Sequence, residues 1–512
     1  MIGGAAAWVL VACSGGGDDP TPPTAPVGDG PQVVAGPELV DPGPQVLLAA
    51  ELHVDTDVPT TLEVRLQEDG ASEIRVLRFA ELAAAHRVPL VGFRAGSTHQ
   101  VGVRLTDAEG EVVEAGPLPF DAGPGLEAPP QRDLLVADPA RMEPGVTLMP
   151  AKLGDQAWIL TLDDQAEIVY AQATSLSINS VTPTPSGDLV MVDGPDLRQV
   201  DLLGRTVRRW TAEPTEPTDV AVPFGDFHHD VFPLADGSVF ALVYDHADVP
   251  EYPESYQDPF AYAPATIRND AVVHVAADGT VLGHWAMLEL LDPHHIGFDA
   301  LGPDPSGALD WVHANAVIYD EATDEVTVSL RHQDAVVHFS AATGALQWIL
   351  AAPDGWDEAL QPYILQPTAP FVRHTHQHAI EFDPDGQTLR MFDNGNDRRN
   401  TPYVSSGQGR EYSRILELRV DPVAMTVAPL GEFGQTSTGP LFATSLGNAD
   451  RLPVTGDRLA TFGTVPRVTE WTAEGEVVFD LELEPGGWRI DRALRRGSLY
   501  GPSVVETVEA AR

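Results

Sequence analysis

Three segments of the chain concentrate side chains that could do chemistry. The first reads Phe-His-His-Asp over residues 227–230, and the second reads Trp-Val-His-Ala-Asn over residues 311–315, with Arg331 further along. The third, residues 373–378, reads Arg-His-Thr-His-Gln-His. Imidazole is a competent nucleophile and proton carrier near neutral pH, and arginine supplies a permanent charge with a planar fork of donors. These residue types indicate nucleophilic or acid–base chemistry beside a fixed cation.

The stretch from residue 129 to the C-terminus repeats an element that could bring these segments together. A run of alternating apolar residues, a polar turn and a strand that often ends in tryptophan occurs six times. The clearest copies end at Trp210, Trp285 and Trp348. Each copy is long enough for a hairpin, so the pattern predicts a six-bladed β-propeller over residues 129–512, with residues 246–268 as its main insertion.

A second repeated phrase predicts where the polar residues lie. It starts with a polar residue, continues with apolar alternation and reaches glycine eight positions later, starting at Asn179, His229, His378 and Asn448. A fifth copy starts at Asn315, where an acidic turn replaces the glycine. If these are the innermost strands of the blades, the five residues converge on one mouth of the channel. The alternative, that they only close the blades by hydrogen bonds, does not explain histidine at two of the five places.

The N-terminal part of the chain has a different pattern. Residues 31–128 contain short alternating stretches separated by turn signals, which is typical of a small antiparallel β-sandwich. Within it, the run Leu82-Ala83-Ala84-Ala85 favours a helical turn. The predicted fold is therefore all-β: a β-sandwich at 31–128, then the propeller. A homodimer contact and a spacer are equal alternatives for the task of the sandwich.

The first thirty residues indicate export. Residues 1–13 are apolar and end in Cys13, and residues 14–30 form a Gly/Pro/Asp-rich linker, an order that resembles a bacterial lipoprotein signal. No Lys or Arg precedes the apolar stretch, so a start further upstream stays open. The alternative is an ordinary cleaved signal peptide with an incidental cysteine. We expect an exported, periplasmic or cell-surface lipoprotein, anchored to the outer membrane through a lipid on Cys13.

Composition excludes several classes of function. The 512 residues include 76 acidic and 30 basic side chains, a formal net charge of −46, which argues against a nucleic-acid-binding protein. The single cysteine excludes an intrachain disulfide and a cysteine-based zinc site. Exposed charges are screened over about 8 Å at physiological salt, so a well-placed arginine can still bind an anionic substrate.

The three chemical segments carry a family resemblance. The order HHD…DG, HxN…RHQxAV and QH…FDNG, over roughly residues 130–500, resembles the bacterial arylsulfate sulfotransferases that do not use a nucleotide sulfate donor. The resemblance implies that His378 is the nucleophile that becomes sulfated. It also implies that His229, His313 and Arg331 hold the sulfuryl oxygens, with Asn315 in support.

Two further residues, Asn448 and His228, complete the predicted substrate-binding set. Asn448 shares the register of the innermost strands, and His228 stands beside His229. The glycine register favours His229 as the inward-pointing member of this pair.

The implied reaction moves a sulfuryl group from a phenolic sulfate ester to an acceptor phenol in two steps. Such a transfer resembles phosphoryl transfer, in which the protein mainly positions the reactants and stabilises charge. No cofactor is implied. Either His313 or His229 could protonate the leaving phenolate.

Two other readings use the same residues. His374, His376 and His378 alternate, so on a strand they would share one face and could bind a metal with His229 and Asp230, as in a metal-dependent hydrolase. An arginine in the same mouth would repel that metal, so we expect no metal. The other reading is a non-catalytic propeller receptor for anionic aryl ligands.

Overall fold

The computed structural model describes residues 30–511, with residue 259 and residues 398–410 and 485–486 left out. Cys13 and nearly all of the predicted linker lie outside the described residues. Helical structure in the described part is limited to α1 (Met287–Leu290) and two 3-10 turns, Arg331–Gln333 and Gln361–Tyr363. The rest is built from strands and loops, which confirms the all-β fold class.

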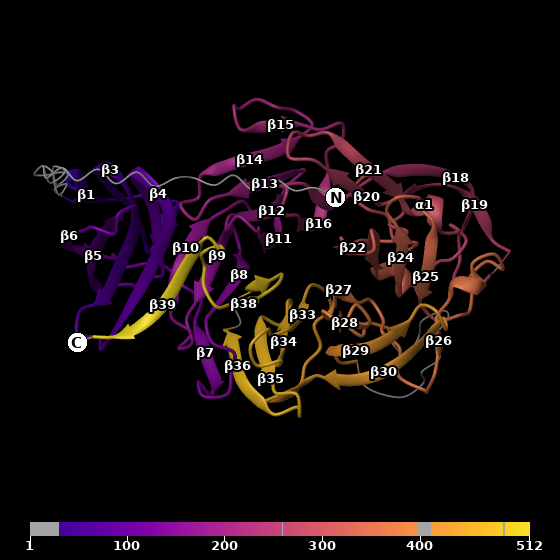
Figure 1. The fold of residues 1–512 in the computed structure, drawn as a ribbon. Helices are drawn as coiled ribbons and strands as arrows, with labels where there is room; N and C mark the ends of the chain where they lie inside the picture. Colours follow the sequence, from indigo (N-terminus) through magenta and orange to yellow (C-terminus); the bar gives the residue numbers. More distant parts are fainter. Residues whose placement is uncertain (1–29, 259, 398–410, 485–486, 512) are drawn as a thin grey trace, which may run out of the picture.

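Six sheets are arranged as a ring of blades around one axis (Figure 1), which is the propeller that the repeats predict. Strands of blade one are β2 (Val46–Leu47), β8 (Val146–Leu153), β9 (Gln156–Leu162), β10 (Ile168–Ala173), β37 (Arg489–Ile490) and β38 (Leu494–Arg496). Blade two contains β11 (Ile178–Pro183), β12 (Leu189–Asp193), β13 (Asp196–Val200), β14 (Thr206–Thr211) and β15 (Asp219–Ala221). Blade three contains β16 (Phe227–Pro233), β17 (Val239–Val243), β20 (Ala271–Val275) and β21 (Val281–Ala286).

The other three blades follow the same plan. Blade four contains β22 (Ala314–Asp320), β23 (Glu325–Leu330), β24 (Ala335–Ser340) and β25 (Leu346–Leu350). Blade five contains β26 (Gln366–Pro367), β27 (His378–Phe382), β28 (Thr388–Asp393), β29 (Arg414–Asp421) and β30 (Thr426–Phe433). Blade six contains β7 (Arg132–Ala137), β33 (Asn448–Arg451), β34 (Arg458–Phe462), β35 (Arg467–Trp471) and β36 (Val477–Leu483).

Two short hairpins lie outside these sheets. The larger, β18 (His246–Pro253) and β19 (Tyr262–Arg268), separates β17 from β20 and coincides with the insertion predicted at residues 246–268. The smaller pairs β31 (Gln435–Thr436) with β32 (Gly439–Pro440).

The ring is closed by both ends of the propeller segment. The early strand β7 pairs with β36 on the outside of blade six, while the late strands β37 and β38 pair with β8 in blade one. In the other blades the first strand lies innermost, so β37 and β38 take the innermost place in blade one (Figure 1). Antiparallel pairing of distant segments in this way leaves no open edge between the first and last blades.

The N-terminal strands form one six-stranded sheet. It contains β1 (Val33–Val40), β3 (Ala49–Glu68), β4 (Glu73–Val91), β5 (Thr98–Asp107), β6 (Val112–Asp121) and β39 (Val504–Ala510). Residues 504–510 were predicted to belong to the propeller, but in the structure they form β39, which pairs with β4. Since the strands form a single hydrogen-bonded sheet, the two-sheet sandwich predicted at 31–128 stays unconfirmed.

The helical turn expected at residues 82–85 is wrong, because this run lies within β4. Ala83 pairs with Thr60 and Ala85 with Asp55 of β3. Pairing along two long strands therefore overrides the helix preference of a short alanine run.

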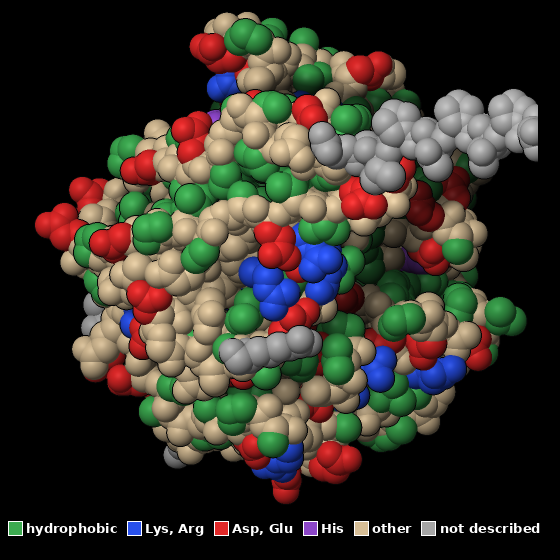
Figure 2. Space-filling view, turned by 60° about the vertical axis from the view of Figure 1, so that its left-hand side comes forward, with side chains coloured by type: hydrophobic (Ala, Val, Ile, Leu, Met, Phe, Trp, Pro, Cys, Tyr) green, Lys and Arg blue, Asp and Glu red, His purple; other side chains and the backbone are tan. Residues whose placement is uncertain are grey.

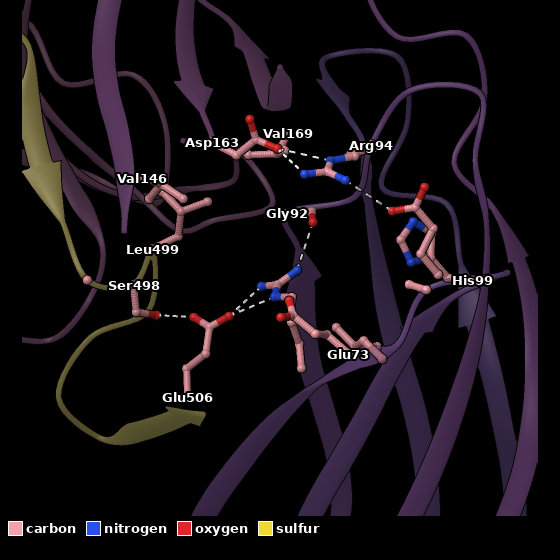
Figure 3. Close-up of a pocket in the computed structure, with 15 residues that line it drawn as sticks. Glu73, Gly92, Arg94, His99, Val146, Asp163, Val169, Ser498, Leu499 and Glu506 are labelled. Atoms are coloured by element: carbon pink, nitrogen blue, oxygen red, sulfur yellow. Dashed lines mark hydrogen bonds and ion pairs between the residues drawn. The ribbon is translucent and has the colours of Figure 1, made fainter. Parts of the chain in front are cut away.

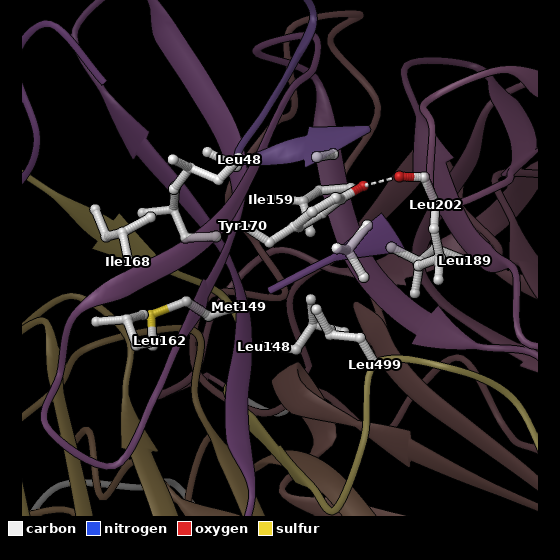
Figure 4. Close-up of a cluster of buried hydrophobic side chains, with 14 of the residues drawn as sticks. Leu48, Leu148, Met149, Ile159, Leu162, Ile168, Tyr170, Leu189, Leu202 and Leu499 are labelled. Carbon is white, nitrogen blue, oxygen red and sulfur yellow. Dashed lines mark hydrogen bonds between the residues drawn. The ribbon is translucent and has the colours of Figure 1, made fainter. Parts of the chain in front are cut away.

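The N-terminal sheet and the propeller share one hydrophobic core. One buried cluster contains Leu52 of β3 together with Met149 and Tyr170 of blade one. Figure 4 shows part of it, with Leu48, just before β3, near Tyr170, and Leu499 from the C-terminal segment. The hydroxyl of Tyr170 donates to the carbonyl of Leu202 at 3.1 Å, so the polar end of this buried ring is satisfied. Burying each large side chain contributes roughly 1.5–3 kcal/mol, so the N-terminal sheet is held firmly to the first blades.

Ion pairs reinforce the same interface. In the pocket drawn in Figure 3, both Nε and Nη2 of Arg94 donate to Asp163 of the loop after β9, at 2.9 and 2.7 Å. Arg205, between β13 and β14 of blade two, binds Glu51 of β3 at 2.5 Å, whereas Arg75 of β4 binds Glu506 of β39 at 2.6 Å within the N-terminal sheet. Among the described residues, no helix is long and apolar enough to cross a membrane.

Acidic side chains occur at many separate places on the face seen in Figure 2, so the negative charge is not gathered in one patch there.

Candidate active site

Four innermost strands share a bulge at the same level of the propeller. The pairing register shifts at Ser180 in β11, at residues 229–230 in β16, at Asn315 in β22 and at Ala379 in β27. Ser180, His229 and Ala379 adopt positive φ angles of 37°, 54° and 44°. A bulge re-aims side chains next to it, and holding such residues in the left-handed region costs roughly 1–3 kcal/mol each. The orientation of these residues is therefore maintained at a cost in folding free energy.

Histidines from three blades meet at this level. The ring of His229 lies 4.8 Å from that of His313 and 6.4 Å from that of His378, measured between ring centroids. His313 also has a positive φ of 49°, just before β22. Residues that are about 150 positions apart in the chain thus form one cluster, as expected when equivalent positions of propeller blades face the axis.

His378 has a defined tautomer. Its Nδ1 lies 2.8 Å from the carbonyl oxygen of Gly447, and because a carbonyl only accepts, Nδ1 carries the hydrogen. Burial lowers the pKa of His378 below its usual value, so the ring is neutral near pH 7. The lone pair is therefore on Nε2, which makes this nitrogen a competent nucleophile.

His313 is held by a carboxylate. Oδ2 of Asp310 lies 2.7 Å from Nδ1 of His313, and the ring of His332 stacks on His313 at 4.4 Å. Burial, with His229 and Arg331 nearby, lowers the pKa of His313 well below its usual value. His313 is therefore neutral, with its lone pair on Nε2 and Asp310 placed to stabilise an added proton.

The same trio, Asp310, His313 and His332, offers ligand atoms within 4.8 Å of one another, so it could hold a metal ion. Its atoms already have partners: Nδ1 of His332 donates to the Asp310 carbonyl at 2.7 Å, and the Arg268 guanidinium lies 3.4 Å from the Asp310 carboxylate. A neighbouring cation disfavours a metal ion, so the trio fits proton handling better.

The metal set that the alternation of His374, His376 and His378 suggested is not formed as a strand face. β27 starts at His378, so the other two histidines precede the strand. Nε2 of His376 lies 3.3 Å from Asp299 and its Nδ1 lies 3.4 Å from Asp334. Burial alone would lower the pKa of His376, but these two carboxylates raise it above the usual value. The two carboxylates thus favour the protonated form of His376, and a protonated imidazole cannot ligate a metal.

Arg331 supplies the permanent charge. It opens the 3-10 turn after β23, is 9% exposed, and donates from Nη2 to the carbonyl of Thr444 at 3.2 Å. Its Nη1 lies 3.5 Å from Asp299, whose side chain is 58% exposed and also contacts His376. The carboxylate of Asp299 therefore contacts both Arg331 and His376 in the structure.

The remaining predicted residues lie around the cluster with different partners. Nδ2 of the fully buried Asn315 donates to the carbonyl of Gln377 at 2.8 Å, and Nδ2 of Asn448 donates to Asp450 at 2.8 Å. The ring of His228 stacks on Tyr244 at 3.8 Å and 7°, and its Nδ1 lies 2.8 Å from Nδ1 of His229. His228 therefore stands behind His229 and supports it.

Two groups of this site, Asp310 and Arg492, were not among the residues predicted from the sequence. Asp310 lies outside the repeated phrases, and no pattern singled it out. Arg492 lies between β37 and β38, the two short strands that form the inner edge of blade one, with Nη1 2.9 Å from Asp230. This segment lacks the glycine eight residues on, so the repeated phrase did not identify it. The one signal that could have done so is that a closed ring of six blades requires a sixth innermost strand.

The sequence of this chain is similar to that of known sulfotransferases. The family model described as "Arylsulfotransferase (ASST)" matches residues 134–483. The arylsulfate sulfotransferase AssT of Lelliottia amnigena is 25% identical over 376 residues, which is 63% of this chain and 54% of the relative. AssT of Escherichia coli O6:H1 is 24% identical over 304 residues, 50% of this chain and 47% of the relative.

This chain therefore spans about half the length of the curated relatives it matches. Among solved structures, a protein of unknown function from Bacteroides caccae has a TM-score of 0.41 at 11% identity and covers 68% of this chain and 98% of its own.

Proposed function

Since this chain belongs to the arylsulfotransferase family, we propose that it is an arylsulfate sulfotransferase that works through a sulfated histidine. A phenolic sulfate ester is the donor, and a second phenol is the acceptor. The sulfuryl group passes through His378 in a ping-pong sequence. No cofactor enters the reaction.

The hydrogen bond between Nδ1 of His378 and the Gly447 carbonyl carries this proposal. It holds the imidazole in the tautomer whose Nε2 can attack sulfur. Neutral His229 and His313 lie in the same cluster, so they can contact the sulfuryl oxygens or phenol oxygens without competing as cations for the donor.

In the first step the Nε2 lone pair of His378 attacks sulfur, the bond from sulfur to the phenolic oxygen breaks, and the phenolate departs with the bonding pair. Arg331 balances the negative charge, since its guanidinium cannot lose its proton. The transition state of such a transfer is loose, so positioning and charge stabilisation are the main contributions of the protein.

In the second step the acceptor oxygen attacks sulfur, the nitrogen–sulfur bond breaks, and His378 returns to its neutral form. We assign the acceptor proton to Nε2 of His313, because Asp310 at 2.7 Å stabilises the resulting imidazolium. That proton is then available to the next departing phenolate. His229, whose Nδ1 is shared with His228, supports the sulfuryl group instead.

The test is turnover of p-nitrophenyl sulfate with an acceptor phenol. We expect nitrophenol release that depends on acceptor and vanishes in His378→Ala, and addition of one SO₃ to the intact protein with donor alone. His338→Ala is the matched control, since His338 is a buried histidine that stacks on Trp348 away from the cluster. Nitrophenol release that does not depend on acceptor would indicate a sulfatase. Loss of activity with a chelator would indicate a metal-dependent hydrolase. Saturable binding of the aryl sulfate without turnover would indicate a receptor.

We also propose export and lipidation at Cys13, which the sequence pattern of residues 1–30 supports. Labelling with a fatty-acid probe in the native host tests this. Label that persists in Cys13→Ser would contradict it.

A further inference from the structure

The innermost strand of blade one brings a second arginine into the hub. Arg492 lies between β37 and β38, its side chain is 13% exposed, and its Nη1 reaches Asp230 of blade three at 2.9 Å. The charges of Arg492, Asp491 and Asp230 all act on the pKa of His378, so this guanidinium lies within electrostatic reach of the nucleophile.

One edge of this guanidinium is vacant. Nε and Nη2 of Arg492 are both buried, and neither has a hydrogen-bond partner among the described residues. These two donors form the side-on fork that binds two oxygens of a carboxylate or a sulfuryl group. Two other arginines have this fork filled, Arg94 by Asp163 and Arg209 by Asp219. Nε and Nη2 of the buried Arg495 also lack a hydrogen-bond partner among the described residues, but its Nη2 already lies 3.3 Å from the Glu470 carboxylate.

The neighbouring carboxylates are engaged with other donors. Asp230 accepts from the backbone N–H of Val231 and Val317, each at 3.0 Å, as well as from Arg492 Nη1. Asp491 accepts from the backbone N–H of Ser180 at 2.7 Å. Both acids hold the bulged strands in place, so neither fills the Nε–Nη2 edge of Arg492, while Asp230 anchors the other edge.

We propose that Arg492 is a catalytic residue whose Nε and Nη2 bind two oxygens of the sulfuryl group as it moves to and from His378. The proposal rests on the proposed function and adds a residue to it. Nη1 stays on Asp230 throughout, so the fork is preorganised. A planar fork suits the three spread oxygens of a loose transition state better than a single ammonium does.

Arg492→Lys tests the fork, because lysine keeps a positive charge beside Asp230 but presents no planar pair of donors. We expect kcat/KM for p-nitrophenyl sulfate to fall by about 100-fold to 1000-fold, the range for losing a preorganised oxyanion contact. SO₃ incorporation with donor alone should slow by the same factor.

Arg495→Lys is the matched control. Arg495 is buried in β38, three residues further along, but its Nη2 faces Glu470 at 3.3 Å and its guanidinium lies over Phe479, away from His378. If the two lysine variants lose activity equally, Arg492 is only a structural ion pair and the proposal is overturned.

A crystal structure of the wild-type protein with an aryl sulfonate, whose carbon–sulfur bond cannot transfer, decides the matter even if the variant fails to fold. We expect sulfonate oxygens within hydrogen-bond distance of both Nε and Nη2 of Arg492. A sulfonate seated on Arg331 and the histidines without Arg492 overturns this inference alone. Absence of SO₃ on His378 in active-site labelling of the wild type would instead overturn the proposed function.

Discussion

Oδ2 of Asp310 lies 2.7 Å from Nδ1 of His313, and because a carboxylate only accepts, the hydrogen is on Nδ1. The bond fixes the ring and leaves the Nε2 lone pair free. Arg268, 3.4 Å from the same carboxylate, balances its charge while His313 is neutral. Residues 310 and 313 therefore form a dyad that can take a proton and return it.

Replacing this carboxylate should slow the step that needs a base. In Asp310→Asn, the amide can donate to Nδ1 and favour the wrong tautomer, so we expect kcat to fall by about 100-fold to 10,000-fold. Because the slowed step is transfer of the sulfuryl group to the acceptor, sulfated enzyme should accumulate. Intact-mass measurement during turnover would detect it. Asp304→Asn is the control, since Asp304 pairs with the same Arg268 at 3.0 Å but does not contact His313. Equal losses in both variants would assign the effect to Arg268.

A single methyl group at Gly447 should disturb the nucleophile. Gly447 has a φ of 116°, and a Cβ there would lie 2.4 Å from the ring of Phe392 and 2.8 Å from the Thr461 carbonyl. Gly447→Ala must therefore displace the carbonyl that holds Nδ1 of His378. We expect SO₃ incorporation with donor alone to slow by at least about 10-fold, given how steeply rate depends on positioning.

The control for that variant is Gly386→Ala. Gly386 has a φ of 65° with open space around it, so alanine there suffers backbone strain without a clash and without contact to His378. Unchanged labelling in Gly447→Ala, at a melting temperature similar to that of Gly386→Ala, would show that the Gly447 carbonyl does not position the nucleophile.

Asp299 should act as a competitor of the anionic donor. Its carboxylate lies 3.5 Å from Nη1 of Arg331 and 3.3 Å from Nε2 of His376, and the residue has a strained φ of 71°. In Asp299→Asn we expect KM for aryl sulfates to fall about 2-fold to 5-fold, since an exposed pair contributes up to about 1 kcal/mol. Asp292→Asn, on the same loop but paired with His294, serves as control. A higher KM in Asp299→Asn would mean that Asp299 positions the cations for substrate.

The register of the repeats was informative because it follows from the fold. The glycine eight residues after each polar residue marks the turn between the first two strands of a blade, so Asn179, His229, His378 and Asn448 all lie on the first strand of their sequence repeat. The bulges were not predictable, because a one-residue shift in pairing leaves no mark on the alternation of a five-residue strand.

Long-range pairing decided the features that the sequence analysis missed. Arg492 enters the hub because the last segment pairs with β8, and β39 joins the N-terminal sheet for a similar reason. His374 and His376 fail to alternate on a strand because β27 begins only at His378. Such outcomes depend on which distant edge is free, and local residue patterns do not encode that choice.

The buried neutral histidines should make the fold sensitive to acid. Burial lowers the pKa of His374 to about 4, from the model-compound value of 6.5. A histidine that is harder to protonate in the folded state stabilises the fold fully above about pH 6.5 and loses this contribution as the pH falls toward its lowered value. For His374 the loss by pH 4 is about 3 kcal/mol at 1.36 kcal/mol per unit. His376 acts in the opposite sense, because its pKa is raised.

We therefore expect the melting temperature to be highest above pH 6.5 and to fall between pH 6.5 and 4. His374→Gln removes one of these groups without touching the hub contacts of His378, so its melting temperature should fall less steeply over that window than the wild type does. Thermal unfolding at half-unit intervals of pH measures this. His294→Gln is the control, because His294 is exposed and paired with Asp292 at 2.7 Å. Parallel curves for His374→Gln and the wild type would mean that the pKa of His374 is the same in the folded and unfolded states.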